Sequence, residues 1–226
     1  QTTAYAFRDS EHAANLFALK ELGPIYTRLN NPTTDILEQR FAALEGGAAA
    51  ICTSSGQAAS FYAIANVAEA GDNIIISDKL YGGSVTLFAY TMKRFGITAK
   101  VFKSDDASDL ESLIDDRTKA IYFESLSNPQ IAIPDVEKIA TIGKKHGVLT
   151  ICDNTVASAA LFNPIKWGID VVVHSTSKYT NGQGTAIGGI VVERDGLAEF
   201  FKANSNRYSH FTTPDESYHG LVYTDV

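Results

Sequence analysis

Several common functional signatures are scarce or missing in this sequence. Only 2 of its 226 residues are cysteines, so no disulfide framework is predicted. No run of about 18 or more apolar residues occurs, which argues against a membrane-spanning helix. Lys and Arg (19) are fewer than Asp and Glu (26), and the net charge of −7 argues against a nucleic-acid partner. The first residues, Gln1–Ala4, lack the charged and apolar regions of a signal peptide.

The cysteines and the five histidines form no metal-binding pattern. Cys52 and Cys152 each lie in an apolar run, and no histidine stands at a paired metal-ligand spacing from them. We therefore expect no metal site and two buried, reduced thiols, as is usual in the cytoplasm.

The remaining composition is that of an ordinary globular protein, with 45% hydrophobic, 10% aromatic and 20% charged residues. The chain begins with Gln1, and its last segment, Tyr223–Val226, has the pattern of a strand that is just starting. We expect residues 1–226 to be part of a longer polypeptide.

Short apolar runs alternate with helical patterns from residue 33 onward. The runs lack polar alternation, which predicts an α/β fold: a mostly parallel sheet of about seven strands with helices on both faces. We expect residues 1–32 to form an N-terminal arm with a short helix near 10–21, and residues 33–226 to form one domain. The expected strands are 48–53, 73–77, 97–102, 119–124, 148–153, 170–174 and 186–193. The expected helices begin near Thr33 and at 57–69, 83–95, 107–114, 135–146 and 197–205.

Three strand ends carry residues suited to chemistry, because ligands of parallel sheets bind beyond the carboxyl ends of the strands. Ser54–Gln57 opens a helix whose free N–H groups suit a phosphate, although an ordinary helix start would look the same. Asp153 ends a buried run and needs a partner, unless it only caps a helix. Lys178 follows an apolar strand among hydroxyl groups, where a solvated surface lysine is the alternative.

Together these three ends match the needs of pyridoxal phosphate: a lysine for the Schiff base, an aspartate for the pyridinium nitrogen and a phosphate site. Ser175 and Ser177 stand two residues apart, so both hydroxyls can face the phosphate if the segment is extended. The sequence has neither G-x-x-x-x-G-K-[ST] nor G-x-G-x-x-G at the first strand, so a nucleoside triphosphate or a dinucleotide is not indicated.

The sequence resembles the Cys/Met-metabolism family of pyridoxal-phosphate enzymes, whose large domain has fold type I. The similarity runs through essentially the whole chain, and the spacing between Asp153 and Lys178 is its most specific part. The motifs that carry it are Tyr26-Thr27-Arg28, Ser54-Ser55-Gly56, Tyr81-Gly82-Gly83, Ser127-Asn128-Pro129, Asp153-Asn154-Thr155 and His174-Ser175-Thr176-Ser177-Lys178-Tyr179.

The resemblance assigns a role to each motif. Lys178 would form the Schiff base and move a proton between substrate carbons, Asp153 would pair with the ring nitrogen, and Tyr81 would stack on the ring. Asn128 would lie near the ring hydroxyl, with Thr155 as a supporting contact. The phosphate would be held by Ser55, Gly56, Gln57, Ser175 and Ser177. The resemblance also places Tyr26 and Arg28 on the phosphate of a neighbouring subunit, since an arginine fork suits a phosphate.

Two positions and one segment indicate which activity within the family the sequence resembles most. Methionine γ-lyases of this family carry a cysteine where this chain has Gly83, and cystathionine enzymes usually have methionine at Gln57. With Pro214–Gly220, these features look more like the O-acetylhomoserine sulfhydrylases, in which sulfide or a thiol replaces the acetate of O-acetylhomoserine. The alternatives are cystathionine γ-synthase, a methionine or cystathionine lyase, or a non-catalytic proteolytic fragment.

The resemblance also implies parts that this chain does not provide. Family subunits continue into a small C-terminal domain, which supplies an arginine for the substrate carboxylate and is largely missing here. Arg207 has no matching motif and is not assigned that role. We expect homodimers or homotetramers with shared sites, an amino-acid substrate, and sulfide, a thiol or a sulfur-carrier protein as the sulfur donor.

Overall fold

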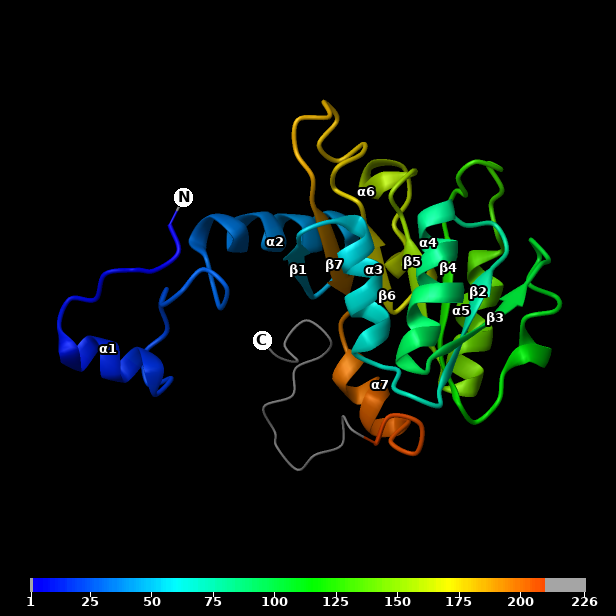
Figure 1. Cartoon of the computed structure of the whole chain (residues 1–226), viewed down its shortest axis with the longest axis horizontal. Helices are drawn as coiled ribbons and strands as arrows, with labels where there is room; N and C mark the ends of the chain where they lie inside the picture. Colours follow the sequence, from blue (N-terminus) through cyan, green and yellow to red (C-terminus); the bar gives the residue numbers. More distant parts are fainter. Residues whose placement is uncertain (1, 210–226) are drawn as a thin grey trace.

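A single seven-stranded sheet forms the centre of the computed structural model, which describes residues 2–209 (Figure 1). The strand order is β1-β7-β6-β5-β4-β2-β3. All neighbouring strands are parallel except for β7, which runs antiparallel to both β1 and β6. The predicted α/β fold with a mostly parallel sheet is confirmed. The strands are β1 (Ala49–Thr53), β2 (Asn73–Ser77), β3 (Thr98–Phe102), β4 (Thr118–Glu124), β5 (Leu149–Asp153), β6 (Val171–His174) and β7 (Gly189–Glu193).

Helices cover both faces of the sheet, because successive strand residues point to opposite sides. Ile74 and Ile76 pack in the cluster that contains Ala63 of α3, whereas Ile75 packs with Ile139 of α5 on the other face. The central strands are buried on both faces, which explains why their sequences show no polar alternation. The helices are α1 (Ser10–Phe17), α2 (Pro32–Glu45), α3 (Gly56–Ala65), α4 (Gly82–Thr86), α5 (Val136–His146), α6 (Ser158–Leu161) and α7 (Leu197–Ala203).

Two expected helices differ from the structure. The helix expected at 83–95 continues from α4 as a π turn, Leu87–Thr91, and a 3-10 turn, Met92–Phe95. The prediction of a helix at 107–114 is wrong, because only a 3-10 turn forms there, at Glu111–Leu113. There the Asp109 carboxylate accepts hydrogen bonds from two preceding backbone N–H groups, and such local bonds compete with helix formation.

The start of α2 also lies slightly earlier than expected. The helix begins at Pro32, and the Asn31 side chain accepts hydrogen bonds from the N–H groups of Thr33 and Thr34. An asparagine cap followed by proline at the first helical position is a favourable helix start.

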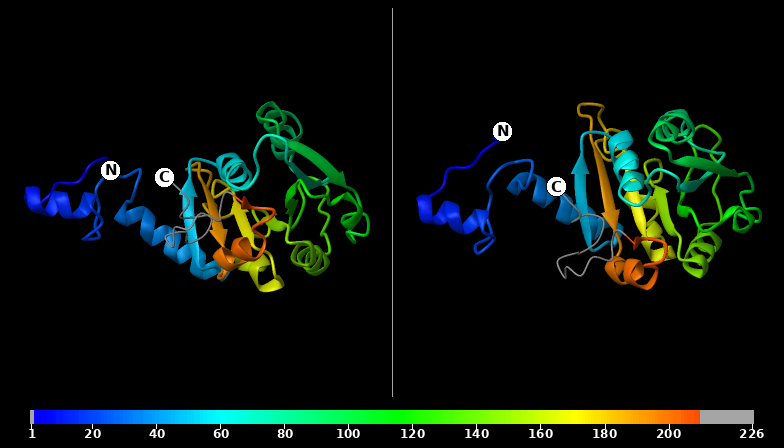
Figure 2. Two further views of the ribbon diagram at one scale, coloured as in Figure 1. Left: turned by 90° about the horizontal axis from the view of Figure 1, so that it is seen from below. Right: turned by 60° about the horizontal axis from the view of Figure 1, so that its bottom comes forward.

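The N-terminal residues 2–31 extend away from the sheet on the side of β1 (Figures 1 and 2). The arm contains α1, which Asp9 caps through the N–H of His12, and a two-residue bridge between Ala4 and Tyr26. The division into an arm at 1–32 and a domain at 33–226 stays a prediction.

Both cysteines are free thiols. Cys152 is fully buried, as expected, whereas Cys52 is only half-buried and sits against Glu38 of α2. Burial and the neighbouring Glu38 carboxylate raise the pKa of the Cys52 thiol to about 12. No helix within residues 2–209 is long and apolar enough to cross a membrane.

Candidate active site

The loops that follow β1, β5 and β6 meet at one end of the sheet, at the top of Figure 1. The register brings their residues close together: Asp153, the last residue of β5, lies beside Val173 of β6 and Glu124 of β4. The segment that contains Lys178 follows directly after β6 and projects beyond the sheet.

Asp153 is half-buried, and both of its carboxylate oxygens accept hydrogen bonds. Its Oδ2 accepts a hydrogen bond from the Tyr122 hydroxyl at 3.2 Å, and its Oδ1 accepts one from the N–H of Thr155 at 3.0 Å. Burial and the Asp153 charge hold the pKa of Tyr122 far above its ordinary value, so this hydroxyl remains a donor. The Asp153 carboxylate therefore points in a fixed direction and does not cap a helix.

The Thr155 hydroxyl links Asp153 to the strand beside it. It donates to Asp153 Oδ1 at 2.5 Å and accepts from the N–H of Ser175 at 2.8 Å. One hydroxyl thus joins the aspartate to the first residue after β6.

The N-terminus of α3 lies against the same segment. Ser55 caps the helix by accepting from the N–H of Ala58 at 3.1 Å. A Cβ atom at Gly56 would lie 2.5 Å from Cβ of Ser175, so only glycine permits this close approach. The first-turn N–H groups of Gly56 and Gln57 have no hydrogen-bond partner in the described part of the chain, and they can serve a phosphate.

Lys178 lies in a turn that backbone hydrogen bonds hold. Its N–H donates to the carbonyl of Ser175 at 3.2 Å, and its carbonyl accepts from Gly182 at 2.8 Å. The side chain is exposed, and within residues 2–209 its amine makes no hydrogen bond or ion pair. The Ser177 hydroxyl instead accepts from the N–H of Gly188 at 2.9 Å, so Ser177 also ties this loop to the approach to β7.

Glu124 is a buried acidic residue at the same strand ends that the sequence analysis did not single out. It ends β4, is 5% exposed, and accepts hydrogen bonds from the N–H groups of Tyr81 and Asn128. Burial and the Asp153 carboxylate raise the pKa of Glu124 to about 7. An acidic residue at the end of a buried run was the available signal, the same one that identified Asp153.

A second buried carboxylate, that of Glu45, contacts residues next to the candidate site. Glu45 of α2 accepts from Nδ2 of Asn154 at 2.9 Å and pairs with Nε2 of His174 at 2.6 Å. Both side chains of the pair are fully buried. Asn154 follows Asp153 and His174 precedes Ser175, so Glu45 connects side chains at the ends of β5 and β6.

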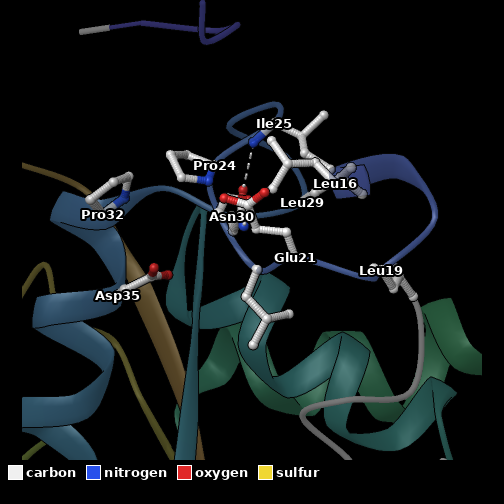
Figure 3. Close-up of a pocket in the computed structure, with 11 residues that line it drawn as sticks. Leu16, Leu19, Glu21, Pro24, Ile25, Leu29, Asn30, Pro32 and Asp35 are labelled. Carbon is white, nitrogen blue, oxygen red and sulfur yellow. Dashed lines mark hydrogen bonds between the residues drawn. The ribbon is translucent and has the colours of Figure 1, made fainter. Parts of the chain in front are cut away.

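The structure does not bring Tyr26 or Arg28 to the strand ends of their own chain. Both lie in the arm, where the Arg28 guanidinium sits 6.0 Å from the Tyr26 ring centre. A pocket of about 530 Å³ lies in the arm beside the start of α2 and is lined mainly by apolar side chains (Figure 3). It includes none of the predicted site residues.

Arg207 lies at the opposite end of the sheet. Its guanidinium donates to the carbonyls of Asp115 and Thr118, where β4 begins, so it cannot serve a substrate at the Lys178 end. The segment Pro214–Gly220 and the strand start expected at Tyr223–Val226 lie outside the described residues.

The groups gathered at these strand ends fit pyridoxal phosphate. A free lysine amine, an oriented carboxylate and unpaired N–H groups at a helix N-terminus are the donor set that this cofactor requires. The family model described as "Cys/Met metabolism PLP-dependent enzyme" matches residues 1–221. The chain belongs to this family.

Curated relatives of the chain include proteins named as sulfhydrylases. Over the whole chain, it is 49% identical to sulfhydrylase FUB7 of Fusarium oxysporum f. sp. lycopersici and 46% identical to an O-acetyl-L-homoserine sulfhydrylase of Leptospira meyeri. It covers 52% and 50% of those proteins, so it spans about half the length of the curated relatives that it matches.

Solved structures share the fold. A Campylobacter jejuni protein described as an O-acetylhomoserine (thiol)-lyase, which contains N'-pyridoxyl-lysine-5'-monophosphate, matches with a TM-score of 0.90 and 56% identity. The match covers 100% of this chain and 56% of that one. Cystathionine γ-lyase of Lactobacillus plantarum matches with a TM-score of 0.79 and 32% identity, over 93% of this chain and 52% of the other.

Proposed function

We propose that the protein catalyses a γ-replacement on O-acetylhomoserine, in which sulfide or a thiol displaces acetate to give homocysteine or methionine. The observation that carries the proposal is the unpaired Lys178 amine, which follows the strand beside the oriented Asp153 carboxylate. The similarity to an O-acetyl-L-homoserine sulfhydrylase and to an O-acetylhomoserine (thiol)-lyase supports this choice of substrate.

The residues divide the work between binding and proton transfer. Bound pyridoxal phosphate supplies an electron sink for the charge that develops on the substrate carbons, and this permits acetate to leave. In our proposal Asp153 holds a proton on the ring nitrogen, because a fixed carboxylate favours the protonated ring. Lys178 Nζ takes the proton from the substrate α carbon and moves protons between the substrate carbons. Loss of a proton from the β carbon supplies the electron pair that expels acetate from the γ carbon, and the protons return after the sulfur nucleophile has added.

The α3 N-terminus and the loop after β6 hold the phosphate in this proposal. The N–H groups of Gly56 and Gln57 and the hydroxyl of Ser175 supply the hydrogen bonds, with the positive end of the helix dipole behind them. Ser55 and Ser177 already make structural bonds, so we assign them to shaping the cradle.

Gly83 favours a sulfhydrylase over a methionine γ-lyase. A Cβ atom at Gly83 would lie 2.6 Å from Cε1 of Tyr81, so a cysteine there would force the half-exposed Tyr81 ring to move. The position of the proposed ring-stacking residue therefore depends on the glycine that distinguishes this chain from those lyases.

Product analysis tests the proposal. The protein, produced as its gene encodes it, is given O-acetylhomoserine with either sulfide or cysteine. Acetate, homocysteine, cystathionine, 2-oxo acids and ammonia are measured. We expect homocysteine and acetate with sulfide, and neither from the Lys178→Ala variant. Cystathionine as the preferred product would indicate a γ-synthase, and a 2-oxo acid with ammonia would indicate a lyase.

We also propose that the enzyme acts in the cytoplasm, where both thiols stay reduced, and as a homodimer or homotetramer. Tyr26 and Arg28 then reach the phosphate of a neighbouring subunit. The support is the arm, which carries both residues away from their own sheet. A sulfur-carrier protein is the alternative to free sulfide, and sulfide-dependent turnover without any carrier would exclude the need for one.

A further inference from the structure

Glu124 joins two loops that come from different strands. Its Oε1 accepts from the N–H of Tyr81 at 2.6 Å, in the turn between β2 and α4. Its Oε2 accepts from the N–H of Asn128 at 2.9 Å, in the loop that follows β4. The carboxylate itself sits at the end of a strand that is buried along its whole length.

The two residues held in this way are those assigned to the cofactor ring. Tyr81 is the ring-stacking residue and Asn128 the neighbour of the ring hydroxyl. Within residues 2–209 neither side chain makes a hydrogen bond, so both are free for a ligand while their backbones are fixed. Fixing the backbone while leaving the side chain free is what a binding group needs.

We propose that Glu124 is a positioning residue that sets the separation between Tyr81 and Asn128 and so the slot for the pyridine ring. It acts through two backbone N–H groups and touches neither cofactor nor substrate. This inference rests on the proposed function, because it takes the ring contacts of Tyr81 and Asn128 from it.

The chemistry of the contact requires a carboxylate. Both partners are N–H donors, so the side chain must accept at two atoms, and an ionised carboxylate offers two oxygens. A glutamine of the same size offers one oxygen and turns an NH₂ group toward the other donor. Glu124→Gln therefore keeps the volume of the side chain but loses one of the two bonds.

The first test uses amide hydrogen exchange on the unmodified protein without cofactor. The N–H groups of Tyr81 and Asn128 are expected to exchange at least tenfold more slowly than those of Gly82 and Gln130, which have no such bond. Equal rates at the four amides would show that Glu124 does not hold the loops. This measurement does not depend on any variant folding.

The second test compares Glu124→Gln with Glu137→Gln, which removes the same charge from the exposed first turn of α5. Cofactor affinity is measured by titration, and ring orientation by visible circular dichroism. We expect Glu124→Gln to bind pyridoxal phosphate about tenfold more weakly, with an altered dichroism signal. The control is expected to match the unmodified protein, and the borohydride-reducible adduct on Lys178 is expected to form in all three.

The outcomes separate the two proposals. Unchanged affinity and dichroism in folded Glu124→Gln would overturn the positioning role while leaving the proposed function intact. If the unmodified protein itself forms no reducible adduct on Lys178, the proposed function fails, and the cofactor-positioning role fails with it.

Discussion

At the scale of single residues, the candidate site depends on a few polar groups that each connect two strand ends. Thr155 joins Asp153 to Ser175, and Glu124 joins Tyr81 to Asn128. The sequence could place Asp153 and Lys178, because each follows a buried run. Glu124 carries the same signal as Asp153, because it ends the buried run 119–124. Its partners could not be read from the sequence, because they are backbone N–H groups, which any residue except proline can supply.

Replacing Thr155 with valine tests the first of these connections. The isosteric Thr155→Val variant leaves the N–H of Ser175 without its acceptor and removes one donor from Asp153. We expect a loss of about 1–2 kcal/mol in the free energy of unfolding, measured in urea, and weaker cofactor binding. Thr141→Val on the exposed face of α5 is the control, and an equal loss in both variants would contradict the connection.

The titration of Glu124 gives a signed prediction for stability. Its pKa is about 7 in the folded protein against an ordinary 4.5, so the folded state binds the proton more tightly than the unfolded state. The stabilisation of the folded state that comes from this pKa difference is fully present at low pH. It is lost as the pH rises from about 4.5 to 7.

The Glu124→Gln variant has no titratable group at position 124, so its unfolding free energy should not include this loss. Relative to the unmodified protein, we expect the unfolding free energy of this variant to gain up to about 3 kcal/mol as the pH rises through this interval. The titratable neighbours Asp153, Tyr122 and Cys152 are common to both proteins. Parallel pH profiles of the two unfolding free energies would contradict the raised pKa.

At the scale of elements, apolar runs located every strand to within a few residues, because buried parallel strands leave continuous runs. The helix expected at 107–114 failed because Asp109 binds the backbone N–H groups of Lys103 and Ser104, and a periodic pattern does not report such bonds. The close packing of Gly56 of α3 against Ser175, in the loop after β6, also could not be predicted from sequence patterns. These patterns are local, whereas the two residues are about 120 positions apart.

Gly56→Ala tests the contact between α3 and that loop. The added Cβ would meet the backbone of Ser175 at 2.8 Å, so the helix or the loop must shift. We expect a loss of about 1–2 kcal/mol in unfolding free energy and weaker phosphate binding, although alanine itself favours helices. Gly82→Ala at the start of α4 meets nothing within 4 Å and should change neither quantity; an equal effect there would refute the contact.

At the scale of the whole molecule, Lys178, Asp153 and the α3 N-terminus lie at one end of the sheet. The arm, residues 2–31, which includes Tyr26 and Arg28, extends away from the sheet. The sequence predicted the class of fold. It also predicted the end of the sheet at which the candidate residues gather, because the carboxyl ends of parallel strands lie at the same edge. How subunits assemble did not follow, because the pattern of one chain does not describe a second copy.

Subunit exchange tests the proposed role of the arm. Lys178→Ala and Arg28→Ala are each expected to be inactive or nearly so when purified alone. A mixed dimer of the two would contain one site with both defects and one site with neither, so co-expression should restore activity. If the mixture stays as inactive as its parts, Arg28 does not serve a neighbouring site.

The central claim is that Lys178 is the residue that binds the cofactor covalently. The most direct measurement is borohydride reduction of the purified protein with pyridoxal phosphate, followed by peptide mass mapping. The account predicts loss of the visible absorbance band and a single pyridoxyl adduct on Lys178. An adduct on another lysine, or none at all, would contradict it.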